Sequence, residues 1–403
     1  MQVLVILLVS LAATGLAQVD SAHPPQGLGI PGIGDFIQKF AQDLSSTSRN
    51  EPRNAVFSPF SITTLLSMLL MGSSGSTYNQ LRSALRYPPQ VPDNLIHETY
   101  RNLMQTLIQD NPGIIVSVAN RIFLNPNADI LLEYSDKALR FYASGLEQLD
   151  FSHPSAARNA INAWVNQMTR GKIPKLLTHV NPQTSALAVN TVYFKGDWKN
   201  PFDKMGTSRG TFNTGKRIVN IPMMSTVMKV LYTDLPALNA EMIGLPYKGD
   251  QFAMYFIVPK GPASLTSLHT LESQLDPHTI NRYIGNMSQI HMNVFLPRMR
   301  LNFKTDLADT LKQLGVTDLF NPSRADFSNM ASNRIFIDKV IHETVIDITE
   351  AGTEAAAATA ATIVRFGSSR EFSVNRPSLL LLREQQTGVP LFWGRIVEPE
   401  PLH

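Results

Sequence analysis

The sequence predicts an α+β fold built as one large domain. Segments with helical periodicity dominate up to about residue 184, and β-rich segments punctuated by Gly or Pro follow them. No linker divides residues 35–400, and no internal repeat is visible. The 403-residue chain contains no cysteine and is 43% hydrophobic, so its stability has to come from a sizeable core rather than from disulfides.

The first 34 residues are expected to lie outside this domain. Residues 1–17 contain an apolar stretch that is too short to span a bilayer, and Gly15 and Ala17 occupy the −3 and −1 positions of a cleavage site. We therefore expect a cleaved signal peptide and a secreted, extracellular protein, although no Lys or Arg precedes the apolar stretch. Residues 18–34 are rich in Gly and Pro and predict a flexible leader.

Helical signals begin at Asp35, which can cap a helix whose apolar face includes Phe40 and Leu44. Ser61–Met71 is apolar on nearly all sides and stops at Gly72, which predicts a fully buried helix. The other expected helices cover residues 94–109, 127–145, 155–169 and 305–314. Strands are expected at Leu187–Phe194, Met254–Val258, Ile290–Leu296, Ile335–Ile348 and Ser378–Leu382.

Composition and motifs argue against several classes of function. The formal net charge is +3 without a concentrated basic face, which argues against a nucleic-acid binder, and no later segment is apolar enough for a transmembrane helix. His97-Glu98 and His342-Glu343 each begin a zinc-protease motif but lack its second histidine. We find no catalytic constellation and expect no enzyme, no metal site and no cofactor.

The most informative segment begins at Glu350. Residues 353–361 are rich in alanine and, taken alone, favour a surface helix or a linker. The predicted strand Ile335–Ile348 leads into them, however, and residues 362–364 resume β character. Small residues between two strand-like stretches suit a segment that can exist both as an exposed loop and as an inserted strand.

Several motifs in register resemble the serpin superfamily. The hinge of inhibitory serpins is similar to Gly352-Thr353-Glu354-Ala355-Ala356-Ala357-Ala358. The other matching motifs are Asn54-Ala-Val-Phe-Ser-Pro-Phe-Ser61, Asn190-Thr-Val-Tyr-Phe-Lys-Gly-Asp-Trp198, Ile221-Pro-Met-Met224, Leu296-Pro-Arg298, Phe372-x-x-Asn375-Arg-Pro377 and Leu391-Phe-Trp-Gly-Arg395. Each motif alone is modest, whereas the same order over most of residues 35–400 is highly specific.

The resemblance implies a serpin domain over residues 35–400, with three β-sheets, about nine helices and an exposed reactive-centre loop at about residues 350–371. It also implies that a serine protease attacks the loop and forms an acyl-enzyme, after which the cleaved loop inserts into the central sheet and drags the protease along. About 14 inserted residues at about 3.4 Å each would move the cleaved end by roughly 45–50 Å.

The hinge composition suits such an insertion. Because side chains alternate along a strand, the buried face would receive Thr353, Ala355, Ala357, Thr359 and Ala361, while Glu354 would point to solvent. None of the five is charged or bulky. The pattern therefore favours an inhibitor over a carrier or binding protein of the same family, and no constellation supports the third reading, a secreted hydrolase.

The resemblance also assigns roles to residues outside the hinge. Four match the shutter, a hydrogen-bonded cluster beneath the strands that must part: Ser58, Ser61, Asn190 and His342. Glu350 and Arg298 match an ion pair at the top of the sheet, the breach, with Trp198 nearby. The alternatives are an ordinary buried polar network and a plain salt bridge of little consequence.

Counting from Gly352 leaves two candidates for the residue that precedes the cleaved bond. The family's commonest spacing selects Phe366–Gly367, which suits a chymotrypsin-like pocket, whereas a hinge shorter by one selects Arg365–Phe366. We expect Arg365–Phe366, because an arginine gains a charge-assisted pair in the pocket of a trypsin-like protease. Arg370–Glu371 is a third alternative.

Partners beyond a protease have weaker signals. We consider a heparin-like sulfated glycan, but no dense basic run favours it; the basic residues concerned are Arg82, Arg86, Arg101, Arg170, Lys172, Lys175, Lys195 and Lys199. Asn286-Met-Ser288 is the only glycosylation sequon. We expect a monomer. The loop resembles those of arthropod body-fluid serpins that restrain melanisation and immune protease cascades.

Overall fold

The computed structural model describes residues 29–48, 52–108, 113–353 and 370–402. The predicted signal peptide, most of the predicted leader and most of the predicted reactive-centre loop lie outside these ranges. The described residues contain nine α-helices: α1 Ile33–Thr47, α2 Pro59–Gly72, α3 Gly75–Ala84, α4 Asp93–Ile108, α5 Leu132–Tyr142, α6 Pro154–Met168, α7 Leu265–Gln274, α8 Pro277–Gly285 and α9 Ala308–Gln313.

Strands account for much of the rest of the described chain. They are β1 Ala55–Phe57, β2 Ile114–Leu124, β3 Leu146–Gln148, β4 Ala186–Asp197, β5 Ser208–Asn213, β6 Ile218–Leu235, β7 Ala240–Pro246, β8 Phe252–Pro259, β9 Ser288–Pro297, β10 Met299–Asp306, β11 Lys339–Ile348, β12 Gly352–Thr353, β13 Glu371–Ser373, β14 Ser378–Glu384, β15 Pro390–Ile396 and β16 Glu400–Pro401. This mixture confirms the predicted α+β class.

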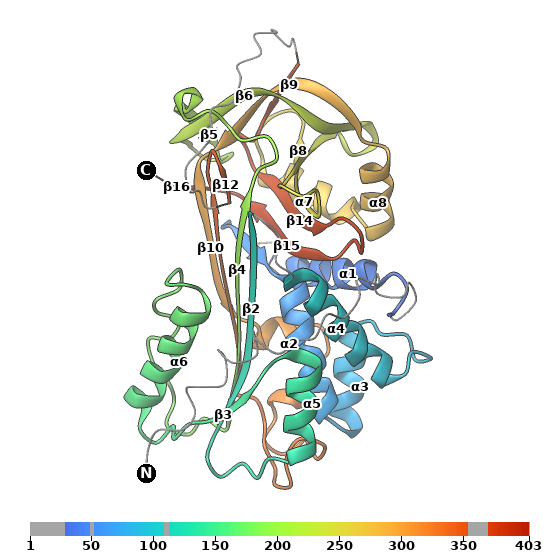
Figure 1. The fold of residues 1–403 in the computed structure, drawn as a ribbon, viewed down its shortest axis with the longest axis vertical. Helices are drawn as coiled ribbons and strands as arrows, with labels where there is room; N and C mark the ends of the chain where they lie inside the picture. Colours follow the sequence, from blue (N-terminus) through green and yellow to red (C-terminus); the bar gives the residue numbers. More distant parts are fainter. Residues whose placement is uncertain (1–28, 49–51, 109–112, 354–369, 403) are drawn as a thin grey trace, which may run out of the picture.

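A seven-stranded sheet forms the centre of the molecule, with strand order β16-β10-β11-β12-β4-β2-β3. Figure 1 shows α6 on one side of this sheet and α2 to α5 gathered on the other. On the α6 side, Trp164 packs edge-on against Phe123 of β2, with ring centroids 5.5 Å apart. Both faces of the sheet are therefore covered, which explains why β4 and β11 are buried almost throughout.

A second, nine-stranded sheet has the order β1-β15-β14-β8-β7-β6-β9-β13, and β5 also pairs with β6. The 18-residue strand β6 runs through two parts of this sheet, because it pairs with β5 at its start, with β9 along its middle and with β7 at its end. Dividing the sheet at β6 gives, with the central sheet, the three sheets that we expected.

Helix α2 is the buried helix that the sequence predicts. Pro59 stands at its first position, where no intrahelical N–H is needed, and nearly every residue is buried. The helix ends at Gly72, as expected, and a Cβ there would lie 2.7 Å from a side-chain atom of Met330. Glycine is required by this close approach as much as by the helix end.

Several predicted boundaries are wrong. Asp35 does not cap α1, because the helix starts two residues earlier with Gly32 as its N-cap, and Ile30 and Ile33 are already buried in the core. Residues 30–34 of the predicted leader 18–34 are thus part of the fold. The helix expected at 127–145 is shorter, because Ile130 forms a β-bridge with Ala331 before the helix starts.

Among the strands of the described residues, β4, β8, β9, β11 and β14 match predicted ones, and the others were missed. Residues 305–306 end strand β10 rather than start a helix, because they pair with His342 and Ile341 of β11. Strand β2 was not predicted at all, although Ile114–Leu124 carries alternating β-branched residues.

Candidate functional site

The candidate site is the seam between strands β4 and β11 of the central sheet. In the lower part of the seam, the two strands pair directly and in parallel, from Leu187–Tyr193 against Lys339–Val345. At the upper end, β12 lies between them and pairs with both, since Thr353 opposes Ile348 of β11 and Gly196 of β4 (Figure 1). The first two hinge residues are therefore already part of the sheet.

A tight turn after β11 brings the chain back between the upper ends of β4 and β11. Thr349 donates its backbone N–H and its hydroxyl to the carbonyl of Gly352, at 2.8 and 2.7 Å. A Cβ on Gly352 would lie 2.0 Å from the carbonyl oxygen of Gly196, so only glycine fits beside β4 here. The glycine of the hinge motif thus allows the close approach that places Thr353 in the sheet.

Thr353 is completely buried (0% exposed) and faces Tyr247, whose hydroxyl oxygen is 2.7 Å from Thr353 Oγ1. The Tyr247 ring stacks on Trp198, with centroids 4.4 Å apart and an interplanar angle of 18°. The Trp198 indole N–H in turn donates to the carbonyl of Thr349 at 3.0 Å. Trp198 lies beside the hinge as predicted, whereas Tyr247 was missed because no motif marks it.

The predicted ion pair at the breach is present. Arg298 Nε lies 3.7 Å from Glu350 Oε2, and Thr207 donates its hydroxyl to the other carboxylate oxygen of Glu350 at 2.7 Å. Glu350 is 4% exposed, and the Thr207 hydroxyl is the closer of these two partners of its carboxylate. The same residues border a cavity of about 560 Å³ that also includes Lys204, Asp347 and Leu402.

The four predicted shutter residues come together under the lower seam. The Ser58 backbone N–H donates to His342 Nε2 at 3.2 Å, so Nδ1 carries the imidazole proton and donates to Asn190 Oδ1. The side-chain amide of Asn190 donates to Ser61 Oγ and to Asn120 Oδ1. Burial lowers the pKa of His342 to about 3, which keeps its ring neutral.

Asn120 is the member of this cluster that sequence reasoning missed. It lies on β2, opposite Asn190 of β4. A polar residue within the alternating apolar pattern of Ile114–Leu124 was the available signal, and it was lost together with the strand itself. The cluster ties α2, β2, β4 and β11 to one another, so strands that part at this seam have to break it.

Glu343, the neighbour of His342, points to the other face of the sheet. It is 6% exposed and pairs in register with Thr191 of β4 and Lys304 of β10. Burial raises the pKa of Glu343 to about 7, and the charge of Lys304 opposes this rise. Lys304 itself donates to the carbonyl of Leu176, in the segment that follows α6.

Several predicted site residues lie outside the described residues: Glu354, Ala355, Ala356, Ala357, Ala358, Arg365 and Phe366. Arg370 is exposed, and its carbonyl accepts a hydrogen bond from the Asn293 backbone N–H at 2.9 Å. Glu371 begins strand β13, which pairs with β9. The sequon residue Asn286 is exposed at the C-terminal end of α8.

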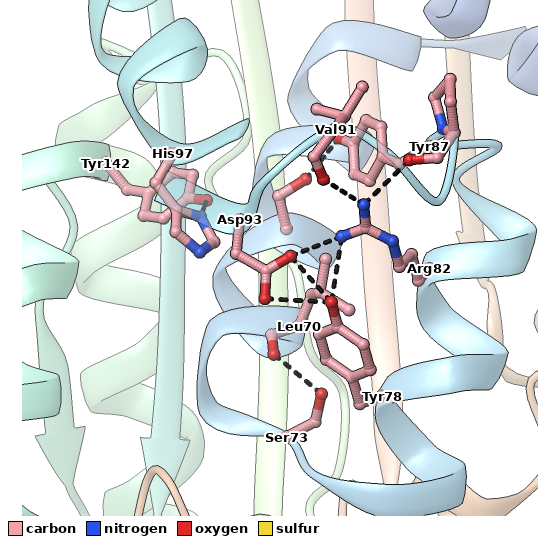
Figure 2. A network of polar contacts seen from close by, with 11 residues as sticks. Leu70, Ser73, Tyr78, Arg82, Tyr87, Val91, Asp93, His97 and Tyr142 are labelled. Carbon is pink, nitrogen blue, oxygen red and sulfur yellow. Dashed lines mark hydrogen bonds and ion pairs between the residues drawn. The ribbon is translucent and has the colours of Figure 1, made fainter. Parts of the chain in front are cut away.

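The basic residues considered for a sulfated glycan are largely engaged with acidic ones. Figure 2 shows the Arg82 guanidinium bonded to Asp93, to the Tyr78 hydroxyl at 3.0 Å and to the carbonyl of Val91. The further pairs are Arg86 with Asp43, Arg101 with Glu98, Lys172 with Asp347 and Lys199 with Asp250. Their charges are therefore partly neutralised on the surface.

The described part of the chain contains no group of three His, Cys, Asp or Glu side chains that could hold a metal ion. None of the helices in those residue ranges is long and apolar enough to cross a membrane.

Comparisons with known proteins agree with this geometry. A family model described as serpin (serine protease inhibitor) matches residues 35–399. The chain is a serpin. It is 34% identical over 373 residues to human leukocyte elastase inhibitor, an alignment that covers 90% of this chain and 98% of the relative. It is 30% identical over 400 residues to bovine plasminogen activator inhibitor 1, covering 96% of this serpin and 98% of that relative.

Solved structures share the fold over nearly the whole length. Human thyroxine-binding globulin, in a complex with thyroxine, superposes with a TM-score of 0.86 at 25% identity, covering 91% of this serpin and 98% of that chain. Uncleaved ovalbumin superposes with a TM-score of 0.82 at 26% identity, covering 91% of this chain and all of that one. The predicted serpin architecture is thereby confirmed.

Proposed function

We propose that this serpin is a secreted suicide inhibitor of trypsin-like serine proteases. The single observation that carries the proposal is the burial of Thr353 between β4 and β11. Thr353 is then already in the position of the first residues of the strand that the cleaved loop would form. Period-2 insertion would next bury Ala355 and Ala357, which are small and uncharged, and would leave Glu354 on the solvent side. A loop that inserts quickly traps the acyl-enzyme before it is hydrolysed.

The chemistry at the loop follows that of a substrate. The protease serine hydroxyl attacks the carbonyl of Arg365 and forms an ester, while the peptide bond to Phe366 breaks and its nitrogen leaves as a protonated amine. The loop up to Arg365 stays attached to the protease. Its insertion along the seam then displaces the protease by roughly 45–50 Å, given about 3.4 Å per inserted residue.

The structure bears unequally on the alternative bonds. Arg370–Glu371 is disfavoured, because Arg370 and Glu371 are already hydrogen-bonded along β9, whereas a protease needs an extended and accessible loop. Arg365–Phe366 and Phe366–Gly367 remain as the trypsin-like and chymotrypsin-like alternatives. We retain Arg365 on the strength of its charge alone.

The test is a mixture with trypsin, followed by a denaturing gel and by mass determination of the released C-terminal peptide. A complex that survives denaturation, and a peptide that begins at Phe366, are expected. In Arg365→Ala, the complex with trypsin is expected to disappear. A trapped trypsin with a peptide that begins at Gly367 would contradict the assignment of the bond.

A carrier function is the second candidate, and it is favoured by the likeness to thyroxine-binding globulin, which was solved with thyroxine bound. Cleavage by trypsin without a stable complex would support it. No glycan enters the proposal, because the candidate arginines Arg82 on α3, Arg86 after α3 and Arg101 on α4 are paired with carboxylates. Secretion predicts a mature protein that begins at Gln18, and an extracellular immune or melanisation cascade is the setting proposed from the loop sequence.

A further inference from the structure

The contact between Thr353 and Tyr247 joins two hydroxyl groups in a site without solvent. Both residues are 0% exposed, and their hydroxyl oxygens are 2.7 Å apart. Apart from Thr353, the only hydrogen-bonding atom recorded within reach of the Tyr247 hydroxyl in the described residues is the Met254 sulfur, a weak acceptor at 3.9 Å. Without its partner, each buried hydroxyl would lose the one good hydrogen bond that it makes with the described residues.

The Tyr247 ring is fixed independently of the hinge. It stacks on Trp198 and meets Phe194 edge-on, with centroids 5.1 Å apart. Gly196 leaves room for the ring, because a Cβ at that position would lie 2.6 Å from Tyr247 Cδ1. The tyrosine hydroxyl is therefore held at one place beside β4, at the level where the hinge enters the sheet.

Thr353 is the last described residue before the loop, and it lies at the upper end of the seam, between β4 and β11. Its backbone opposes Gly196 and Ile348, but β12 is only two residues long, so few backbone hydrogen bonds hold it. A side-chain hydrogen bond in a dry site is then a large part of what keeps the hinge in the sheet.

We propose that Tyr247 is a positioning residue for loop insertion, and that its hydroxyl holds Thr353 inside the sheet so that insertion starts from this position. The inference rests on the proposed inhibitory function for its consequence, but the hydroxyl contact acts in the intact protein, before any protease is present. Removing either hydroxyl lets the hinge leave the gap, and the cleaved loop then has to re-enter before it can extend.

Hydrogen exchange of the intact protein, followed by mass spectrometry of peptides that cover residues 348–353, measures this contact directly. In Tyr247→Phe and in Thr353→Val, exchange in these peptides is expected to accelerate about fivefold, equivalent to about 1 kcal/mol for one buried hydrogen bond. Thr353→Ser keeps the hydroxyl and is expected to exchange like the wild type. The double variant is expected to exchange no faster than the faster single variant, because it leaves neither hydroxyl unpaired.

Tyr134→Phe is the matched control. Tyr134 is also buried, and its hydroxyl donates to the carbonyl of Met68 at 2.8 Å, away from the hinge. This variant is expected to leave exchange at 348–353 unchanged. Equal acceleration in Tyr134→Phe and Tyr247→Phe, no acceleration in Tyr247→Phe, or additive effects in the double variant would each overturn the inference.

A parallel reaction with trypsin separates this inference from the proposed function. Tyr247→Phe is expected to give more cleaved chain per trapped trypsin than the wild type and Tyr134→Phe. If even the wild type forms no complex while the exchange results hold, the inhibitory function is wrong and the hinge contact stands. If the wild type forms a complex, and Tyr247→Phe gives the same ratio of cleaved chain to complex and the same hydrogen exchange at residues 348–353, the proposed role of Tyr247 is wrong and the inhibitory function stands.

Discussion

The two ends of the β4–β11 seam are built in opposite ways. At the upper end, a two-residue strand separates β4 from β11 and is held by one hydroxyl pair and the backbone around Gly352. At the lower end, the strands pair directly over seven residues, above a cluster in which His342 and Asn190 reach α2 and β2. At the upper end, an inserted strand between β4 and β11 has thus already begun, whereas at the lower end the two strands are still paired with each other.

This contrast indicates the direction in which the sheet can open. If separation begins at β12, the upper ends of β4 and β11 are already apart, because Gly352 and Thr353 lie between them. Separation that begins at the lower end would first break several buried hydrogen bonds, each of which leaves an unpaired group. We therefore expect insertion to run from the breach toward the shutter, and the following experiments test each part of that comparison.

The largest effect is expected at the upper end, from Thr353→Arg. The arginine would have to bury an unpaired charge where the wild-type residue is completely enclosed, at a cost of several kcal/mol. Trypsin is expected to cleave this variant without forming a stable complex. Thr211→Arg, on the exposed strand β5, is the control and should inhibit normally. A normal yield of complex from Thr353→Arg would show that Thr353 does not enter the sheet.

Asn190→Ala tests the closed end. Asn190 bonds to His342, Ser61 and Asn120, so its removal leaves buried polar groups unpaired and should lower the free energy of unfolding by about 2 kcal/mol. Asn302→Ala, at an exposed position of β10 in the same sheet, is the matched control and should change little. Equal urea midpoints for the two variants would contradict the idea that this hydrogen-bonded cluster holds β4 and β11 together.

Glu343 makes the closed part of the seam sensitive to pH. Its pKa of about 7 in the folded protein exceeds the usual 4.5, so the folded state retains a proton that the unfolded state has lost. Stability should therefore fall as the pH rises from about 4.5 to about 7, by up to about 3 kcal/mol from this group. Glu343→Gln should remove this part of the pH dependence, as measured by urea unfolding at pH 5 and pH 8. An unchanged slope in the variant would place the dependence elsewhere.

The smallest effect is expected from Arg298→Ala at the breach. The guanidinium is about one-third exposed and lies 3.7 Å from the Glu350 carboxylate, so the pair should contribute less than about 1 kcal/mol. Thr207 still donates to Glu350 in the variant. Thermal unfolding should shift only slightly, and a loss as large as that of Asn190→Ala would mean that the ion pair, rather than the hydroxyl pair, holds the upper end.

The sequence predicts the parts of this account that depend on local pattern or on motifs. The buried helix α2 and strand β4 follow from apolar runs, and the hinge follows from the motif at Gly352–Ala358. The four shutter residues were identified by resemblance, and their meeting in space required the fold. Tyr247 and Asn120 were missed, because the partners through which they act, Thr353 and Ser61, lie 106 and 59 residues away in the chain.

The boundaries fail for a similar reason. Asp306 has helix-like neighbours in sequence, but β11 offers it a ladder partner, so tertiary pairing overrides local preference. The alanine-rich run after Thr353 has a strong local preference for helix, and only its position between two strands opposes that preference. Under the proposed mechanism this segment adopts two structures, an exposed loop and an inserted strand, so its local propensity alone cannot predict both.

Thermal unfolding of the intact protein and of the protein cut once in its reactive-centre loop tests the central claim most directly. If the seam accepts the severed loop, the cut molecule gains a complete central strand and should melt well above the intact one. If both forms melt at the same temperature, the hinge does not open into a usable gap, and the proposed inhibitory mechanism is wrong.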